Sequence, residues 1–394
     1  MSAPALEITT TRSIFEAIRP VIERNRDVGE TAANLPGEVI SAMRQAGVFA
    51  MWTPRALGGL ELDPLPVLKL VEDISSIDAS AGWVASNAVG LTFLAQSLPE
   101  SGARQVLADP NAILAGAGFP LGNAEVVPGG YRVTGQHAFG TGSKWADWFS
   151  VLNVVIENGS PRTHPDGSPV AVFAYLPAKD VTVLDNWDTL GMRGTGSADF
   201  RWEGVFVPED LAYAVGPLDH PSPPFAGPLY RGGIYITAAA VGSVALGISR
   251  AAVEEGKRIA IEKTPSYLAT GLANNGAVQR LIARAEALHG ASQAYLYKVI
   301  GDIWEMSLSG RRPSLADVAQ AQLATSFAVE SAARVTQMIH EVAGTTGIRN
   351  SSRLTRYFRD AHTVSQHGFA SAARWDSAGQ VLLGRPADWG FFNF

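Results

Sequence analysis

The chain has 394 residues, of which 46% are apolar and only 17% are charged, and its formal net charge is −6. This length exceeds what one ordinary hydrophobic core holds, so we expect two or three domains. So few charges favour extensive contacts between subunits, and the absence of a basic run argues against a nucleic-acid partner. Because the chain has no cysteine, a disulfide framework, a thiolate metal site and a cysteine nucleophile are all excluded.

The N-terminal segment has no apolar core of signal-peptide length. No stretch reaches the roughly 18 apolar residues of a membrane span, and the longest candidate, 234–248, is short and broken by glycines. We therefore expect a cytoplasmic protein with no membrane partner.

Residues 1–110 are expected to form an N-terminal α-helical domain. Pro36 suits the first turn of a helix, and Gly47 suits the position just after its end. Segment 79–98 is apolar nearly all round, which predicts a helix buried on most sides. The first helix is predicted from apolar residues with the spacing of one buried face, at positions 14, 15, 18, 21 and 22.

Residues 111–215 have a different texture, with short runs rich in Val, Phe and Tyr between turn clusters. The clearest turns are Pro128-Gly129-Gly130 and Asn158-Gly159. This alternation predicts a middle antiparallel β domain.

Residues 216–394 return to long helical segments rich in small residues, which predicts a C-terminal four-helix bundle domain. Ser314 and Asp317 have the spacing of a capping box at one helix start. The expected helices are 234–262, 276–306, 314–344 and the segment after Arg353. The fold class is therefore α+β, with a helical domain, a β domain and a helical bundle in that order.

Several blocks in this order resemble the acyl-CoA dehydrogenase superfamily over nearly the whole chain. GYRVTGQHAFGTGSKWADW (130–148) is similar to the family's G-x-K-x-W-I-T-N segment. AGTTGI (343–348) is similar to its GGxG segment, and RDA (359–361) follows at the family's distance. One short glycine motif would be weak evidence for this superfamily. All the blocks together, in order and on the expected elements, are a specific signal for it.

The resemblance implies a flavin cofactor. In the family a hydroxyl of the 130–148 block lies near flavin N5, and by register that residue is Thr141, with Phe139 beside the ring. A hydroxyl can donate to or accept from N5 during the redox cycle. Ser143 is a second candidate hydroxyl. The cofactor-binding residues implied by the resemblance are Phe139, Thr141, Gly142, Ser143, Gly344, Thr345 and Gly347.

Two departures from the family pattern are informative. The carboxylate base that common dehydrogenases carry just after RDA is replaced by His367 and Gly368. The RxxFG segment that grips the FAD pyrophosphate is also missing, and EKTPSYLATG (262–271) occupies that region. This loss favours FMN or weakly held FAD.

With these departures, the chain resembles the two-component (group D) flavin-dependent monooxygenases that share this fold. The resemblance implies an oxygenase component that takes reduced flavin (FMNH2 or FADH2) from a separate flavin reductase. With O2 it would form a C4a-hydroperoxyflavin and hydroxylate or epoxidise a small aromatic substrate, phenolic or indole-like. It also implies a homotetramer, with 343–348 contributing to a cofactor site at a subunit interface.

His367 is then the predicted catalytic residue, together with Thr141. An imidazole whose pKa is near neutral can protonate a peroxide or deprotonate a substrate. A metal pair is a poor interpretation, since His362 and His367 are about 140° apart on a helix and no carboxylate or cysteine completes a set. His362 is expected to be structural.

The predicted substrate-binding residues are Trp83, Asn87, Leu91 and His367. Phenol-hydroxylating relatives often carry a histidine on the buried N-terminal helix, whereas this chain has Leu91 near that position and Asn87 as the nearest polar residue. An apolar pocket of this kind favours an indole-like, sulfur heterocyclic or unactivated aromatic substrate. The Trp-rich C-terminal tail could close over the pocket or pack on a subunit, and packing is favoured.

Two alternatives remain open from the sequence. One is an acyl-CoA dehydrogenase whose carboxylate has moved to another bundle helix, with Glu254, Glu255 and Glu262 as the acids to check. The other is a non-catalytic flavin-binding protein.

Overall fold

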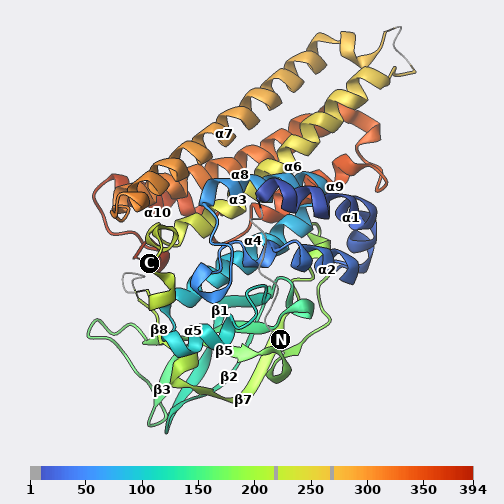
Figure 1. Ribbon diagram of the computed structural model, residues 1–394. Helices are drawn as coiled ribbons and strands as arrows, with labels where there is room; N and C mark the ends of the chain where they lie inside the picture. Colours follow the sequence, from blue (N-terminus) through green and yellow to red (C-terminus); the bar gives the residue numbers. More distant parts are fainter. Residues whose placement is uncertain (1–9, 217–220, 267–269, 394) are drawn as a thin grey trace.

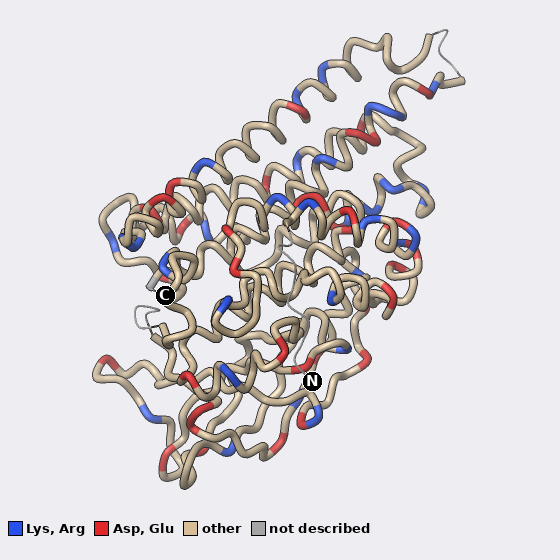
Figure 2. Tube along the Cα trace, viewed as in Figure 1, with Lys and Arg blue, Asp and Glu red and all other residues tan. Residues whose placement is uncertain are grey.

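The computed structural model describes residues 10–216, 221–266 and 270–393. Figure 1 shows three layers, with the β-sheet at one end, the long bundle helices at the other and the N-terminal helices between them. The order of helical domain, sheet and bundle agrees with the sequence-based prediction. Charged residues of both signs are scattered over the outer helices and loops (Figure 2).

The N-terminal layer is built on α4, which is buried along most of its length as its apolar sequence predicts. Asp78 caps this helix, with its side chain accepting from Ser80 N–H. Because α4 contacts both β1 and α6, it lies between the sheet and the bundle. The helices of this layer are α1 (Thr11–Ala32), α2 (Gly37–Gln45), α3 (Pro64–Ile77), α4 (Ala79–Leu94) and α5 (Glu100–Val106).

The middle layer is one sheet in the order β6-β7-β2-β1-β3-β5-β8, with β4 paired to β3. The predicted antiparallel β domain is present with one exception, since β1 and β3 pair in parallel while the other strand pairs are antiparallel. The chain leaves β2 through a long loop and returns on the other side of β1, which makes β3 run parallel to it. The strands are β1 (Leu114–Val127), β2 (Gly130–His137), β3 (Trp148–Glu157), β4 (Ser160–Pro161), β5 (Ala171–Pro177), β6 (Thr182–Val183), β7 (Phe200–Pro208) and β8 (Ala212–Ala214).

The C-terminal layer contains three long helices and two shorter ones. The single helix predicted after Arg353 is in fact two, α9 and α10, separated by the segment that carries His367. The predicted capping box at Ser314 and Asp317 is present. The helices are α6 (Tyr235–Glu262), α7 (Gly276–Leu308), α8 (Leu315–Ala343), α9 (Arg353–Val364) and α10 (Ala373–Leu382).

Helix α6 is long and apolar enough to pass as a membrane span by length and composition. However, 83% of its most apolar 18-residue window is buried inside the protein. Its neighbours are α3, α4, α7, α8 and α9. The helix is therefore explained as the central core helix of the bundle.

Candidate functional site

The loop between β2 and β3 turns sharply and is held against a second loop of the sheet. Gly140 N–H donates to Ala198 O at 2.9 Å, and Gly142 N–H donates to Thr195 O at 3.1 Å. A Cβ on Gly140 would lie 2.6 Å from the Phe200 ring, and Gly142 has φ of +69°. Both positions therefore need glycine, and the two loops line the same cavity.

Hydroxyls from these loops form one buried chain of hydrogen bonds. Trp83 Nε1 of α4 donates to Thr141 Oγ1 at 3.1 Å, and Thr141 Oγ1 lies 2.9 Å from Ser197 Oγ. Ser197 Oγ lies 2.8 Å from Thr195 Oγ1. Thr195 Oγ1 donates to Met192 O at 2.8 Å. We call this set the hydroxyl chain.

The hydroxyl chain has only one consistent direction. Thr195 uses its single proton on a carbonyl, which can only accept, so Ser197 must donate to Thr195. Ser197 then has no proton left, so Thr141 must donate to Ser197. With its proton committed and one lone pair taken by Trp83, Thr141 offers the cavity an acceptor and no donor.

His367 lies in the segment between α9 and α10 and faces the same cavity. Its ring meets the Trp83 ring edge-on, with centroids 4.9 Å apart. Phe369 N–H donates to Nδ1 at 3.4 Å, so the neutral ring carries its proton on Nε2. Burial lowers the pKa of His367 to about 4. The predicted near-neutral pKa is therefore wrong, and at neutral pH the residue is an uncharged donor through Nε2.

The cavity has a volume of about 570 Å³ and its lining residues include none with a carboxylate, ammonium or guanidinium group. Thr141, Ser197 and Thr195 form one polar wall, and Phe139 stands at the rim with 67% of its surface exposed. Trp187 meets Phe139 edge-on, with ring centroids 6.1 Å apart. We call this the outer cavity.

A second cavity of about 180 Å³, here called the inner chamber, adjoins the outer cavity and shares its walls at Asn87, 116–118 and His367. Most of its remaining wall is apolar and comes from α4, α6 and the C-terminal segments. Those apolar residues are Leu91, Leu94, Phe173, Ile234, Val241, Phe369 and Phe391. Thus all four predicted substrate-binding residues line one or both cavities.

The C-terminal tail packs on its own chain. Trp389 contacts both Phe369 and Phe391, with ring centroids 5.0 Å apart in each pair. Phe391 forms part of the chamber wall. The tail thus closes one side of the inner chamber, which is the alternative that the sequence did not favour, and its packing on another subunit stays a prediction.

Other predicted residues lie elsewhere or behave differently. Ser143 is buried and its hydroxyl donates to Gly196 O at 3.4 Å, so it does not line the outer cavity, and neither does Gly142. His362, expected to be structural, does line it, although its ring also packs on Phe358 with centroids 4.3 Å apart. Gly344, Thr345 and Gly347 follow α8 and border neither cavity.

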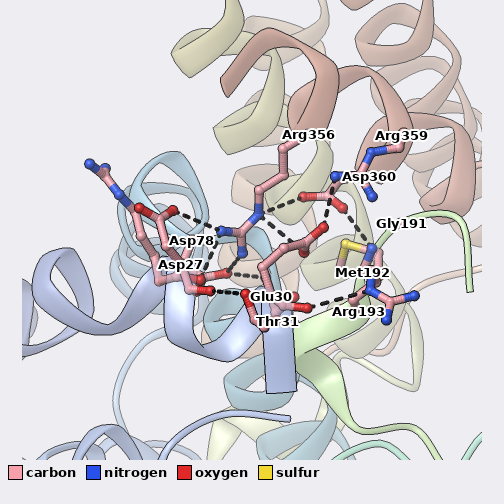
Figure 3. Close-up of polar contacts among 12 residues, drawn as sticks. Asp27, Glu30, Thr31, Asp78, Gly191, Met192, Arg193, Arg356, Arg359 and Asp360 are labelled. Carbon is pink, nitrogen blue, oxygen red and sulfur yellow. Dashed lines mark hydrogen bonds and ion pairs between the residues drawn. The ribbon is translucent and has the colours of Figure 1, made fainter. Parts of the chain in front are cut away.

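A cluster of ion pairs ties α9 to the loop that ends the hydroxyl chain (Figure 3). Asp360 is 1% exposed and accepts from Met192 N–H at 2.6 Å. Arg356 lies 3.6 Å from the Asp360 carboxylate and 2.8 Å from Asp78 at the start of α4. Glu30 of α1 lies 2.7 Å from Arg359. The cluster therefore fixes the Met192 carbonyl relative to all three layers.

The Asp360→Asn variant is expected to lose less stability at about pH 7 than at about pH 4. Burial raises the pKa of Asp360 to about 6, although Arg356 and Met192 N–H act in the opposite direction. Between an unfolded pKa of about 4 and this value, the native protein holds a proton that the unfolded chain has released. Wild-type stability from this group therefore falls as pH rises through that window.

Asparagine has no such titration, so the stability difference between the proteins should shrink by up to about 3 kcal/mol across the window. Urea unfolding at both pH values measures it, with Asp376→Asn, which changes an exposed carboxylate, as the control. An equal loss at both pH values would mean that folding does not raise the pKa of Asp360.

Comparison with known proteins gives consistent matches. Residues 9–104 match the acyl-CoA dehydrogenase N-terminal domain model, and residues 239–372 match the acyl-CoA dehydrogenase C-terminal domain model. The chain is 31% identical over 387 residues to indole-3-acetate monooxygenase of Pseudomonas putida, covering 98% of this chain and 96% of that protein. It is 32% identical over 383 residues to a pigment production hydroxylase of Rhodococcus sp., covering 92% of this chain and 94% of that protein.

The chain belongs to the flavin-dependent monooxygenases of the acyl-CoA dehydrogenase superfamily. Among solved structures, XiaF from Streptomyces sp. in complex with FADH2 and glycerol has the same fold, with a TM-score of 0.88 at 24% identity. It covers 96% of this chain and 97% of that one. The fold of this chain is therefore the one that the sequence predicts.

The outer cavity of this monooxygenase fits a flavin ring. Its wall offers an unfilled acceptor at the Thr141 hydroxyl. Thr141 is only 7% exposed, but it lines the cavity. The exposed Phe139 ring at the rim is a large apolar surface that a planar ligand could cover. The described residues that line the cavity include no lysine or arginine to pair with a phosphate, so the cavity suits the ring system of a flavin better than its phosphate end.

Sequence reasoning missed several residues of the monooxygenase site. Ser197, Thr195 and Trp187 line the outer cavity, but they lie in a loop with no periodic pattern. The only signal was the run GMRGTGS (191–197), whose glycines allow close approach: a Cβ on Gly191 would lie 2.4 Å from Arg359 O. That run could have indicated a loop pressed against α9.

Proposed function

We propose that the outer cavity binds the ring system of reduced flavin and that the inner chamber binds a small aromatic substrate, indole-like or phenolic. The observation that carries this proposal is the joint wall of the two cavities, where His367 faces both while Thr141 faces the outer one. Reduced flavin bound there supplies, with O2, the oxygen atom that is transferred. A separate flavin reductase would deliver the reduced flavin.

Thr141 would hold the N5 edge of the flavin. Reduced flavin carries an N–H at N5, whereas oxidised flavin has only a lone pair there. Because the hydroxyl chain leaves Thr141 with an acceptor and no donor, its position suits the reduced form. Trp83 and Ser197 would thus set the redox preference of the site by fixing one hydroxyl.

His367 would act at the boundary between the cavities. With its proton on Nε2 and its pKa near 4, the ring donates a hydrogen bond without carrying charge at neutral pH. It can steady an oxygen between flavin and substrate by donating the Nε2 hydrogen bond, while Nδ1 keeps the Phe369 contact. The catalytic assignment of His367 and Thr141 rests on this geometry.

The relocated-base dehydrogenase is less well supported. None of the described residues lining the two cavities is an aspartate or glutamate. Glu254 pairs with Lys257 at 2.8 Å, and Glu255 and Glu262 both pair with Arg258. These three acids lie on the second half of α6 and border neither cavity, so none of the three is placed to remove a substrate proton.

The proposal is tested by supplying the protein with a flavin reductase, NADH, flavin and indole under 18O2. We expect one labelled oxygen atom in the product, detected by mass spectrometry, and we expect catalase to leave the yield unchanged. Reduction of bound flavin by an acyl-CoA, with no label in any product, would overturn the proposal in favour of a dehydrogenase. Flavin binding without either reaction would favour the non-catalytic alternative.

We also propose a cytoplasmic homotetramer in which a neighbouring subunit binds the flavin phosphate. A pocket of about 490 Å³ beside 343–348 is lined by Arg258, Arg349 and Arg353, with Thr346, Ser351 and Ser352 and with Glu255, which pairs with Arg258. Guanidinium groups suit phosphate, and the adjoining Ile348 is 68% exposed. Light scattering on the eluted protein should give four times the chain mass, and a monomer would contradict this assembly.

A further inference from the structure

The charges of the side chains that line the inner chamber limit the class of substrate that it can bind. Its described lining residues include no lysine and no arginine, and the same holds for the outer cavity. The residues outside the described ranges, 1–9, 217–220, 267–269 and 394, contain neither lysine nor arginine in the sequence. The chain therefore supplies no cationic side chain to the chamber.

The titratable groups on the two walls do not change this conclusion. They are His362 on the outer cavity and His367 on both cavities. Burial lowers the pKa of each imidazole, to about 4 for His367. Both rings are therefore uncharged at neutral pH and cannot balance a carboxylate.

Arg374 is the cation to consider behind the chamber wall. Its guanidinium lies over the Trp389 ring at 3.9 Å from the centroid. Trp389 in turn contacts Phe391, which is the residue that lines the chamber. Aromatic rings thus separate Arg374 from the ligand space, and Arg374 borders neither cavity.

The hydroxyls of Ser86 and Thr237 in the chamber use their protons on backbone carbonyls, so toward a ligand they can only accept. Ser86 Oγ donates to Trp83 O at 2.9 Å, and Thr237 Oγ1 donates to Ile234 O at 2.7 Å. Asn87 Nδ2 also donates to Trp83 O at 2.9 Å, which fixes the amide so that its oxygen is left without a donor among the described residues. A ring N–H or O–H would be matched by these oxygens, whereas a carboxylate would find only neutral donors such as His367 Nε2–H and no cation to balance its charge.

The size of the chamber limits the ligand further. Its volume of about 180 Å³ is below the roughly 300–1,000 Å³ of pockets for drug-sized ligands. One small bicyclic ring fits this scale better than a ring that carries a long substituent.

Building on the proposed function, we propose that the inner chamber selects an uncharged heteroaromatic ring that donates an N–H or O–H to Asn87 Oδ1, and rejects carboxylate-bearing analogues. Burying a carboxylate with no cation to balance its charge carries a large free-energy penalty. The ring donor replaces the water that would otherwise satisfy the amide oxygen. This substrate class differs from the one named for the Pseudomonas putida relative.

The test measures equilibrium binding of four probes to the purified protein loaded with oxidised flavin, at neutral pH, by isothermal titration. Indole is the reference, N-methylindole lacks the ring N–H, indole-3-acetamide adds a neutral side chain, and indole-3-acetate adds a charged one of the same size. We expect indole-3-acetate to bind at least about 100-fold more weakly than indole-3-acetamide. N-methylindole should bind about 10-fold more weakly than indole.

Asn87→Leu should remove the difference between indole and N-methylindole and keep the difference between the amide and the acid. Acetate binding as tight as acetamide binding would overturn the proposal, as would failure of all four probes to bind. Turnover is scored separately with reductase and 18O2. If no probe is oxygenated, the proposed function fails, while the binding ratios still decide which ligand class the chamber accepts.

Discussion

Replacing Thr141 by valine is expected to weaken binding of reduced flavin about 10-fold and to change binding of oxidised flavin much less. Valine keeps the shape of threonine and removes the acceptor that Thr141 offers to the outer cavity. Anaerobic titration with reduced flavin and aerobic titration with oxidised flavin measure the two affinities. The variant should also lose stability, because Trp83 Nε1 and the Ser197 hydroxyl lose their partner.

Two further variants make this test specific. Thr141→Ser keeps the hydroxyl and should behave like the wild type. Ser197→Ala keeps Thr141 but frees its proton, so Thr141 can donate to the lone pair of oxidised N5. The ratio of the two affinities should then shift toward oxidised flavin. If Ser197→Ala leaves the ratio unchanged, the direction of the hydroxyl chain does not control flavin preference.

The layers of the fold were predictable because each depends on local sequence. Helix α4 has a continuous apolar surface, and Ser314 with Asp317 marks a helix start through contacts three residues apart. The parallel pairing of β1 and β3 was not predictable in this way. Residue patterns report that a segment is a strand, whereas its neighbour in the sheet depends on the path of the connecting loops.

The candidate site likewise has features that local sequence predicts and features that depend on distant contacts. Thr141 and His367 were found by their register in motifs that resemble a known family, and the structure brings them to one cavity. Their chemistry came from partners distant in sequence, which no motif contains. Ser197 fixes the proton of Thr141, and burial moves the pKa of His367 far below the neutral range that an isolated imidazole would have.

Replacing His367 by alanine is expected to lower the rate of product formation by about 100-fold or more while reduced flavin still binds. The hydroxyl chain at Thr141 does not include His367, so the contact with flavin N5 stays in place. Oxygen consumption should continue and appear as hydrogen peroxide, because the donor at the boundary of the two cavities is missing. Measuring labelled product and peroxide in the same reaction gives the fraction of coupled turnover.

The coupling of a second variant and the pH dependence of coupling distinguish hydrogen-bond donation by His367 from acid catalysis by His367. His367→Gln offers an uncharged N–H, and it should recover part of the coupling that alanine loses. Because the pKa of His367 is about 4, wild-type coupling should stay flat between about pH 6 and pH 8. A coupling profile that falls with a midpoint near pH 6.5 only when His367 is present would show instead that the imidazole titrates during turnover. In that case the bound flavin and substrate must return its pKa toward the ordinary value, since the protein alone holds it low by desolvation.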